Sequence, residues 1–165
     1  MRWVVLIVGI LVGLVVLMAL VGFLLPVGHV ASRSVVVRGA PDQVWATITD
    51  VQGFPTWRTD VTSVRPLPDE NGHPRWEERG SNGTIVYEAV ELAPPRRLVS
   101  RIASTGLPFG GSWTYELTPE DSGTRVSITE RGEVYNPIFR FLSRFVFGQT
   151  ATMDSFLKDL GRKHG

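Results

Sequence analysis

The sequence predicts an α+β domain in which a seven-stranded, curved, antiparallel sheet wraps one long C-terminal helix, preceded by one N-terminal transmembrane helix. Three observations support this prediction. An uncharged aliphatic run extends from Trp3 to Leu25. Between residues 61 and 134, apolar and polar residues alternate in segments separated by turn sequences, which is typical of half-buried strands. From Asn136 to Lys163, apolar residues recur at steps of three and four, which indicates an amphipathic helix.

The N-terminal run is long enough to cross a membrane. At about 1.5 Å per residue, Trp3 to Leu25 covers about 34 Å, whereas the hydrocarbon core of a bilayer is roughly 30 Å thick. The apolar region of a cleaved signal peptide is shorter, about 7–15 residues, and ends at a small-x-small site. His29-Val30-Ala31 is a poor site of this kind. We therefore expect an uncleaved anchor and short linker over residues 1–29 and a soluble domain over residues 30–165.

The flanks of the anchor do not decide its orientation. Arg2 precedes the span and Arg33 and Arg38 follow it, so the positive charges nearly balance. The side of the membrane on which the soluble domain lies stays open. Gly9 and Gly13 form a small-xxx-small pair, which predicts at most a weak self-association of two such helices.

The soluble domain is electrically neutral. Of the 17 Lys and Arg residues only Arg2 lies before it, and the remaining 16 match the 16 Asp and Glu residues. A neutral domain without a basic run is a poor candidate for binding nucleic acid. The absence of cysteine excludes disulfides.

The domain is expected to begin with a strand and two short helices. A short linker over about Pro26 to Ser32 leads to Ser34–Arg38, which is rich in the β-branched residues that favour strands. Pro41 suits the first position of a helix that ends near Asp50. A second helical turn is expected around Gln52 to Phe54.

Six further strands are predicted, over residues 61–67, 75–79, 84–92, 98–105, 112–117 and 124–134. Short links between them favour an antiparallel meander. Gly110-Gly111 is expected to form a hairpin turn. The alternation of residues places Trp113 and Tyr115 on one face of their strand. In segments 84–92 and 98–105 both faces carry apolar residues, so their inward register stays open.

The last element is predicted as one long helix with Asn136 as N-cap and Pro137 in its first turn. A curved sheet that wraps such a helix leaves space between the two, so we expect an apolar pocket. Gly148 removes a side chain where a ligand could lie. The sheet, the helix and the rim contribute the expected ligand-binding residues, which are Trp57, Trp113, Tyr115, Val126, Ile128, Glu130, Leu142, Phe145 and Gln149.

The sequence contains no recognisable catalytic constellation. His29, His73 and His164 are expected beside the membrane, in a turn and in the tail, so neither a metal site nor a cofactor is predicted. Glu130 is the one weak catalytic candidate, because it shares the inward face of its strand with Val126 and Ile128. A buried carboxyl without a partner could act as an acid. The alternative is a solvated Glu130 at the rim, or one paired with Arg101 or Arg131.

Several segments resemble the START-like (SRPBCC) superfamily of helix-grip proteins and its polyketide cyclase/dehydrase-like branch. They are Ala40-Pro41-Asp42-Gln43-Val44-Trp45, Asp50, Phe54-Pro55-Thr56-Trp57, Pro94-Pro95-Arg96-Arg97-Leu98, Ser112-Trp113-Thr114-Tyr115-Glu116-Leu117 and Gly123-Thr124-Arg125-Val126. The resemblance covers about Arg33 to Leu160 and implies a deep hydrophobic cavity between the sheet and the long helix. It is specific for the fold and not for function, since the fold hosts lipid carriers, ligand binders and enzymes. The N-terminal span departs from the usual soluble members.

Three functional hypotheses follow. The leading one is a single-pass protein, of the bacterial plasma membrane, that binds a hydrophobic small molecule or lipid without transforming it. The second is a cyclase- or dehydratase-type enzyme in which Glu130, Tyr115 or Arg101 moves protons. The third is a ligand-free interaction module with a filled core, with Gly9 and Gly13 as its pairing residues. The identity of the ligand is not predicted.

Overall fold

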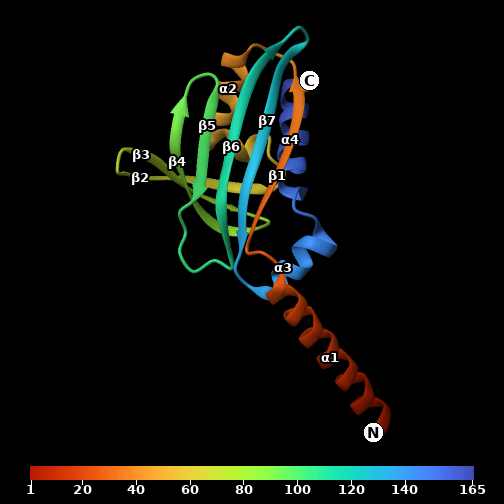
Figure 1. The fold of residues 1–165 in the computed structure, drawn as a ribbon. Helices are drawn as coiled ribbons and strands as arrows, with labels where there is room; N and C mark the ends of the chain where they lie inside the picture. Colours follow the sequence, from red (N-terminus) through yellow and green to blue (C-terminus); the bar gives the residue numbers. More distant parts are fainter.

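The computed structural model describes residues 1–165 and has the predicted helix-grip architecture (Figure 1). The N-terminal part comprises α1 (Arg2–Leu24), β1 (Gly28–Val37), α2 (Pro41–Thr49) and the 3₁₀ helix η1 (Val51–Thr56). The strands that follow are β2 (Val61–Glu70), β3 (His73–Gly80), β4 (Gly83–Ala93), β5 (Arg97–Ile102), β6 (Phe109–Glu120) and β7 (Gly123–Val134). The chain ends with α3 (Pro137–Leu142), the π-helix η2 (Ser143–Phe147) and α4 (Ala151–His164).

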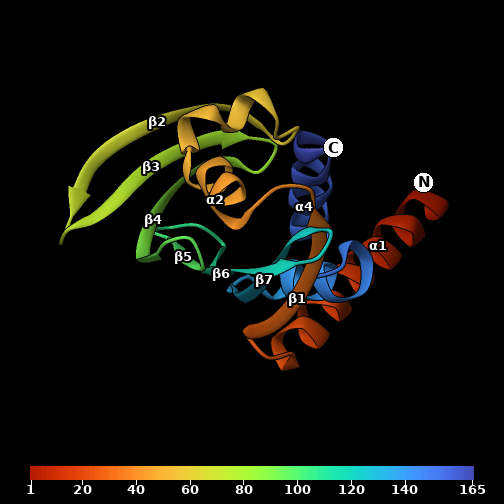
Figure 2. The ribbon, with the colours of Figure 1, turned by 90° about the horizontal axis from the view of Figure 1, so that it is seen from above.

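The seven strands form one sheet in the order β1-β7-β6-β5-β4-β3-β2, and every neighbouring pair is antiparallel. β2 to β7 form the predicted meander, and β1 closes onto β7 with Val35 opposite Val126. Shifts in register interrupt the β2–β3 and β4–β5 pairs, and such irregularities bend a sheet. The sheet consequently curves around α2 and α4 when seen from above (Figure 2).

The structure resolves the two registers that the sequence left open. Tyr87 and Ser100 face the inner side of the sheet, where both line a cavity. Glu88 and Arg101 are opposite each other on the outer side, and Arg101 Nη2 donates to Glu88 Oε2 over 2.9 Å. On the outer face, Glu88 and Arg101 thus satisfy each other, and this leaves the inner face of β4 and β5 to line the cavity.

Two predicted boundaries are wrong. β1 begins at Gly28, so most of the expected linker belongs to the strand. Gly110 and Gly111 do not form a hairpin turn but lie in β6, where Gly111 is opposite Gly132. Gly111 has a φ of +126°, and a Cβ there would lie 2.3 Å from the carbonyl oxygen of Arg131. The glycine is therefore required by close approach of two strands and not by a turn.

The single long C-terminal helix is also a wrong prediction. The helix breaks at Gly148, which has a φ of +78°, and α4 begins only at Ala151. Positive φ is a conformation that ends helices and that glycine adopts without strain. Of the two parts of the predicted helix, it is α4 that packs inside the curved sheet, and its buried apolar residues are Met153, Phe156, Leu157 and Leu160. The preceding segment packs against α1 instead.

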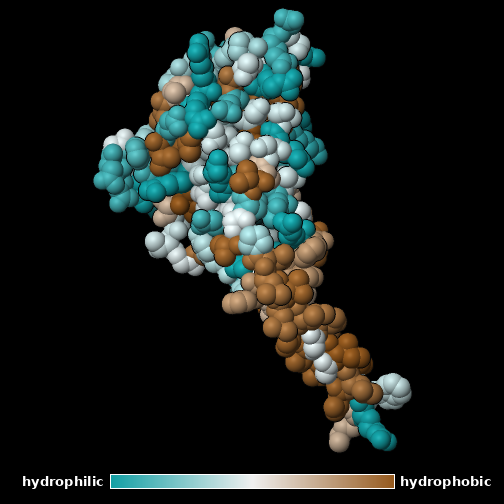
Figure 3. Space-filling model, viewed as in Figure 1, coloured by the Kyte–Doolittle hydropathy of each residue, from teal (hydrophilic) through white to brown (hydrophobic).

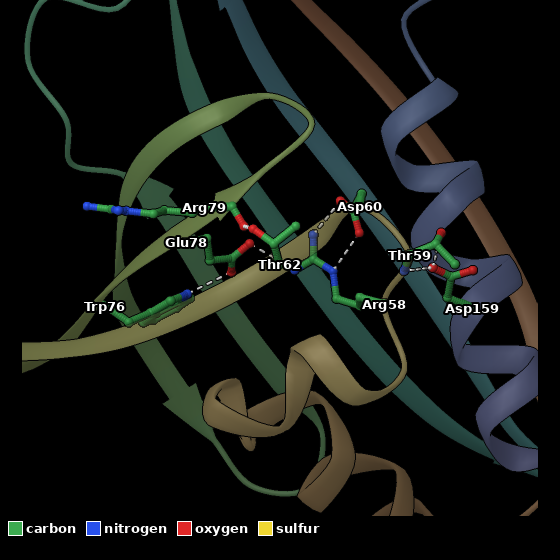
Figure 4. Close-up of polar contacts among 8 residues, drawn as sticks. All are labelled: Arg58, Thr59, Asp60, Thr62, Trp76, Glu78, Arg79 and Asp159. Atoms are coloured by element: carbon green, nitrogen blue, oxygen red, sulfur yellow. Dashed lines mark hydrogen bonds and ion pairs between the residues drawn. The ribbon is translucent and has the colours of Figure 1, made fainter.

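Asp159 ties α4 to the loop that follows η1. Its Oδ2 accepts hydrogen bonds from the backbone N–H of Thr59 over 2.6 Å and from Thr59 Oγ1 over 2.8 Å (Figure 4). Arg162 pairs with its other oxygen. Burial by itself would raise the pKa of Asp159, but these hydrogen bonds and the Arg162 charge hold the pKa below its ordinary value. The ionised carboxylate therefore stabilises the packing of α4.

α1 projects from the domain, and its apolar side chains form a continuous hydrophobic surface (Figure 3). Gly22, near its end, is its only buried residue. By length and composition α1 qualifies as a membrane span, and a signal sequence would meet the same criteria.

Replacing Asp159 by Asn should lower the free energy of unfolding of the full chain in detergent by about 1–3 kcal/mol at pH 7. Because the folded-state pKa of Asp159 is depressed, its stabilisation exists above the unfolded pKa of about 3.9 and is lost as the pH falls through the folded pKa. The difference between Asp159→Asn and wild type should therefore shrink below about pH 4. Urea denaturation followed by tryptophan fluorescence measures it. Asp121→Asn, in an exposed turn, is the control and should change stability little. An equal effect of both variants would refute this role.

Candidate ligand-binding cavity

A cavity of about 690 Å³ lies between the inner face of the sheet and the helices. This volume falls within the roughly 300–1,000 Å³ that is usual for small-molecule sites. α4 packs on the β1 side of the sheet, α2 contacts β6 and β7, and η1 contacts β2. The cavity lies between these helices and the central strands. The apolar wall is formed by side chains from four neighbouring strands, among them Trp76, Ile85, Ala89, Leu98, Ile102 and Trp113.

The structure brings together four of the nine expected ligand-binding residues. Trp113, Tyr115, Glu130 and Gln149 all line the cavity. They come from β6, β7 and the segment before α4, so the predicted alternation of the last two strands places their side chains on the inner face.

Val126, Ile128 and Trp57 belong to the packed core and do not line the cavity. The two aliphatic side chains are fully buried in the cluster that also contains α4. Trp57 was expected at the rim, but its ring packs edge-on against Phe54 and Phe156, with centroids 5.6 and 5.4 Å apart. These residues form the packed core next to the cavity.

Leu142 and Phe145 lie outside the cavity wall, contrary to expectation. Both were placed on a helix that continued into α4. Since the helix breaks at Gly148, Leu142 is in α3 and Phe145 is in η2, where its side chain is 59% exposed. The predicted apolar stripe holds in α4, but not before the break, where Ser143–Phe147 is a π-helix and Arg140 is the buried residue of α3.

Glu130 forms a polar cluster with Trp113 and His29 at one side of the cavity. Trp113 Nε1 donates to Glu130 Oε2 over 2.9 Å, and His29 Nε2 lies 3.3 Å from Glu130 Oε1. Burial raises the pKa of Glu130 above its ordinary value, although the Trp113 hydrogen bond and the His29 charge act in the opposite direction. The expected partners were wrong, because Arg101 pairs with Glu88 on the outer face and Arg131 does not pair with Glu130.

His29 was expected beside the membrane and away from the inner face. Because β1 begins at Gly28, His29 is part of the sheet and lines the cavity. A Cβ on Gly132, directly opposite in β7, would lie 2.3 Å from the His29 ring. The glycine thus makes room for the imidazole next to Glu130.

A second buried cluster, centred on Arg58, was missed by the sequence analysis (Figure 4). Arg58 Nη1 donates to Glu78 Oε2 over 3.0 Å, while its Nε and Nη2 donate to the two oxygens of Asp60 over 3.1 and 2.7 Å. Trp76 Nε1 donates to the other oxygen of Glu78 over 2.7 Å. The Arg58 guanidinium also lies 4.9 Å from the ring centroid of Phe54, within cation–π distance.

Charge and burial oppose each other in this cluster. Burial would lower the pKa of Arg58, but the hydrogen bond to Asp60 and the charges of Glu78 and Asp60 raise it above its ordinary value. For Glu78, burial is the largest effect and raises the pKa despite the Arg58 charge. One permanent cation therefore faces two carboxyls.

Tyr87 and Tyr115 add two hydroxyl groups to the cavity wall. Burial raises the pKa of both phenols, so they stay neutral and available as hydrogen-bond donors. The charges of Arg58 and Glu78 act on both tyrosines. The cavity therefore combines apolar walls with a few fixed polar groups, an arrangement suited to a largely apolar molecule with one or two polar atoms.

One sequence signal could have found part of the Arg58 cluster. Trp76 and Glu78 are two positions apart in one strand, so they share a face, and a buried Trp76 implies an inward Glu78. Arg58 and Asp60 lie between η1 and β2, where no periodicity applies. No group of three or more His, Cys, Asp or Glu side chains is arranged to hold a metal ion.

Comparisons with known proteins agree with this geometry. A family model described as polyketide cyclase/dehydrase and lipid transport matches residues 29–165. The aromatase/cyclase Zhui from Streptomyces sp. R1128 has a TM-score of 0.66 at 15% identity, over 83% of this chain and 93% of that one. A START superfamily protein from Mycobacterium smegmatis also has a TM-score of 0.66 at 15% identity, over 82% of this chain and 97% of its own.

A longer relative contains a similar domain. The di-domain aromatase/cyclase StfQ of the steffimycin biosynthetic pathway has a TM-score of 0.67 at 13% identity, and 84% of this chain is covered. The match covers only 51% of the StfQ chain, so this chain corresponds to about half of that protein. No curated protein sequence gives a significant match. At these identities the solved structures establish a common fold.

Replacing Arg58 by Met should destabilise the full chain by about 3–5 kcal/mol at pH 7, because it leaves the buried carboxyls of Asp60 and Glu78 without their cation. Arg65→Met is the matched control, since Arg65 pairs with Glu77 at the surface with its side chain 66% exposed. The control should cost less than about 1 kcal/mol. Urea denaturation in detergent compares the two. A loss for Arg58→Met as small as that of the control would show that the cluster is not a structural ion-pair network.

Proposed function

Because the chain belongs to the polyketide cyclase/dehydrase and lipid transport family of START-like (SRPBCC) proteins, we propose that it binds a hydrophobic small molecule or lipid while anchored to a membrane by α1. The observation that carries this proposal is the cavity of about 690 Å³ with predominantly apolar walls. An apolar cavity of this volume gains free energy when an apolar molecule replaces the water within it. Binding of such a molecule in this cavity requires no chemical reaction.

Anchoring is proposed from the surface of α1. Most of its large residues are about half exposed or more, among them Leu6 at 56%, Leu11 at 56% and Leu17 at 57%. Such a continuous apolar surface is unfavourable in water and favourable in a bilayer. We propose that the protein is a single-pass membrane protein, with the bacterial plasma membrane as the expected location. The charges flanking α1 leave its orientation open.

A cyclase- or dehydratase-type enzyme is the second candidate. Burial raises the pKa of Glu130, and a carboxyl that keeps its proton nearer to neutral pH can donate it to a bound substrate. Tyr115 supplies a neutral hydroxyl in the same cavity. The ligand-free interaction module requires a filled core, so the size of the cavity argues against it.

A photoactivatable fatty acid and a photoactivatable polycyclic aromatic probe test the binding proposal on the full chain in phosphatidylcholine vesicles. We expect either probe to label peptides from the inner face of β4 to β7. Ser100→Phe fills the cavity from β5 and should reduce this labelling at least tenfold. Val99→Phe, on the opposite face of the same strand, should leave it unchanged. Labelling of α1 is the internal control for access to the probe. Equal labelling in both variants, or none in the wild type, would contradict cavity binding.

Glu130→Gln and Tyr115→Phe distinguish binding from catalysis. A binding protein should retain probe labelling within about threefold in both variants, because neither substitution removes much apolar surface. An enzyme that uses these groups for proton transfer should instead lose about a hundredfold or more in rate on a polyketide-like substrate. The labelling assay and a cyclisation assay by mass spectrometry measure the two outcomes. Turnover by the wild type with such a loss in the variants would favour the enzyme.

A further inference from the structure

The segment formed by α3 and η2 (residues 137–147, the α3–η2 segment) exposes an unusual number of large apolar side chains. Phe139 is 52% exposed, Phe145 59%, Val146 62% and Phe147 64%. Scattered apolar residues are normal on a protein surface, but a cluster of aromatic and aliphatic side chains on one short segment marks a surface that contacts something apolar. The position of the segment beside α1 indicates which apolar surface it contacts.

Arg140 fastens the α3–η2 segment to the end of α1. Its Nη1 donates to the carbonyl oxygens of Gly22 and Leu25 over 3.1 and 2.9 Å. Its Nε and Nη2 donate to the carbonyl oxygens of Val134 and Tyr135 over 2.9 and 3.0 Å. The Arg140 side chain is thus buried and satisfied by four backbone carbonyls. One belongs to the last turn of α1 and one to its C-cap Leu25, where no helical N–H reaches the carbonyl oxygens.

The contact between α3 and α1 is a backbone contact. A Cβ on Gly22 would lie 1.9 Å from the carbonyl oxygen of Pro137, so only glycine allows α3 to approach this closely. Gly22 lies inside the apolar run that ends at Leu25. α3 therefore touches α1 about one turn before that run ends, and Figure 1 shows α3 at the junction of α1 and the domain. With α1 in a membrane, as the proposed function requires, this height corresponds to the bilayer interface.

The same segment lies at the mouth of the cavity. Phe139 and Phe147 line the cavity although more than half of each side chain is exposed, so they stand where the cavity opens. Gly148, also in the lining, leaves open space beside its Cα. Arg144 is exposed on the segment, and its long side chain can reach lipid phosphates while its stem stays among apolar groups.

We propose that the α3–η2 segment lies in the interface of the bilayer that α1 spans, and that it opens the cavity toward the acyl chains. A hydrophobic ligand then moves between bilayer and cavity without crossing water. The occupant of this surface is a lipid bilayer and not a second protein, because Arg140 holds the segment against the end of α1, whose own surface is hydrophobic (Figure 3). The domain is neutral, so apolar insertion and not charge holds it there. This inference rests on the proposed function.

The test uses single cysteines, since the chain has none of its own. Phe147→Cys, Val12→Cys and Ser122→Cys are labelled with an NBD fluorophore in the full chain, reconstituted in phosphatidylcholine vesicles. A phosphatidylcholine with a spin label high on its acyl chain should quench the label at position 147, and one with a spin label near the end of the chain should quench the label at position 12, near the middle of the span. The label at position 122, in the turn at the opposite end of the domain, should be quenched only by aqueous iodide. These three positions report the segment, the anchor and the solvent.

The outcomes separate this inference from the anchor itself. Iodide quenching at position 147 together with lipid quenching at position 12 overturns the inference and leaves the anchor intact. Iodide quenching at both position 147 and position 12 overturns both the inference and the proposed anchor. A label at position 147 that neither quencher reaches indicates a protein partner, such as a second copy, and also overturns the inference.

A second measurement tests the path of the ligand. Phe145→Ser/Val146→Ser removes exposed apolar side chains that do not line the cavity. Labelling of the cavity by the photoactivatable fatty acid should become at least tenfold slower when the probe is supplied in vesicles. It should be unchanged when the probe is supplied to the same chain in detergent. An unchanged rate from vesicles would show that ligands do not enter through this segment.

Discussion

The break of the C-terminal helix at Gly148 is the constraint on which the rest of the structure depends. After this break, α4 packs inside the curved sheet beside α2, with its Phe156 and Leu160 buried, and a cavity of about 690 Å³ remains between the sheet and the helices. The residues before the break pack on α1, where Arg140 holds them. The break at Gly148 thus separates the helix that packs inside the sheet from the segment that packs on the anchor.

The polar groups of the cavity come from the sheet and from the loop before β2, and pairing with one another holds them. Arg58, Asp60 and Glu78 are paired with one another, and Glu130 is paired with Trp113 and His29. Desolvation makes unpaired charges in such a place unfavourable, so these groups remain because each has a partner. The two tyrosines stay neutral between them. A ligand with a large apolar body can make dispersion contacts with the apolar walls and directional hydrogen bonds with these few polar groups.

Local signals in the sequence were sufficient for the fold and for part of the site. Turn sequences between alternating segments identified the strands, and parity along β7 placed Glu130 on the inner face. Contacts between distant parts of the chain could not be predicted in this way. Arg58 enters the cavity from a loop without periodicity, and His29 does so because β1 starts beside α1. The sequence shows Gly148 only as a position without a side chain, whereas its positive φ depends on the competition between the sheet and α1 for the residues on either side.

Native mass spectrometry of the full chain released from lipid nanodiscs tests the central claim, that the cavity holds a hydrophobic molecule. We expect the chain to be released with one bound molecule of a narrow mass class. Extraction with organic solvent should identify this molecule as a lipid or another hydrophobic compound. The Ser100→Phe chain, released under the same conditions, should carry much less of it, since Ser100 lies in the cavity wall. A wild-type chain that is always released bare, or a bound molecule that Ser100→Phe retains in full, would contradict the account.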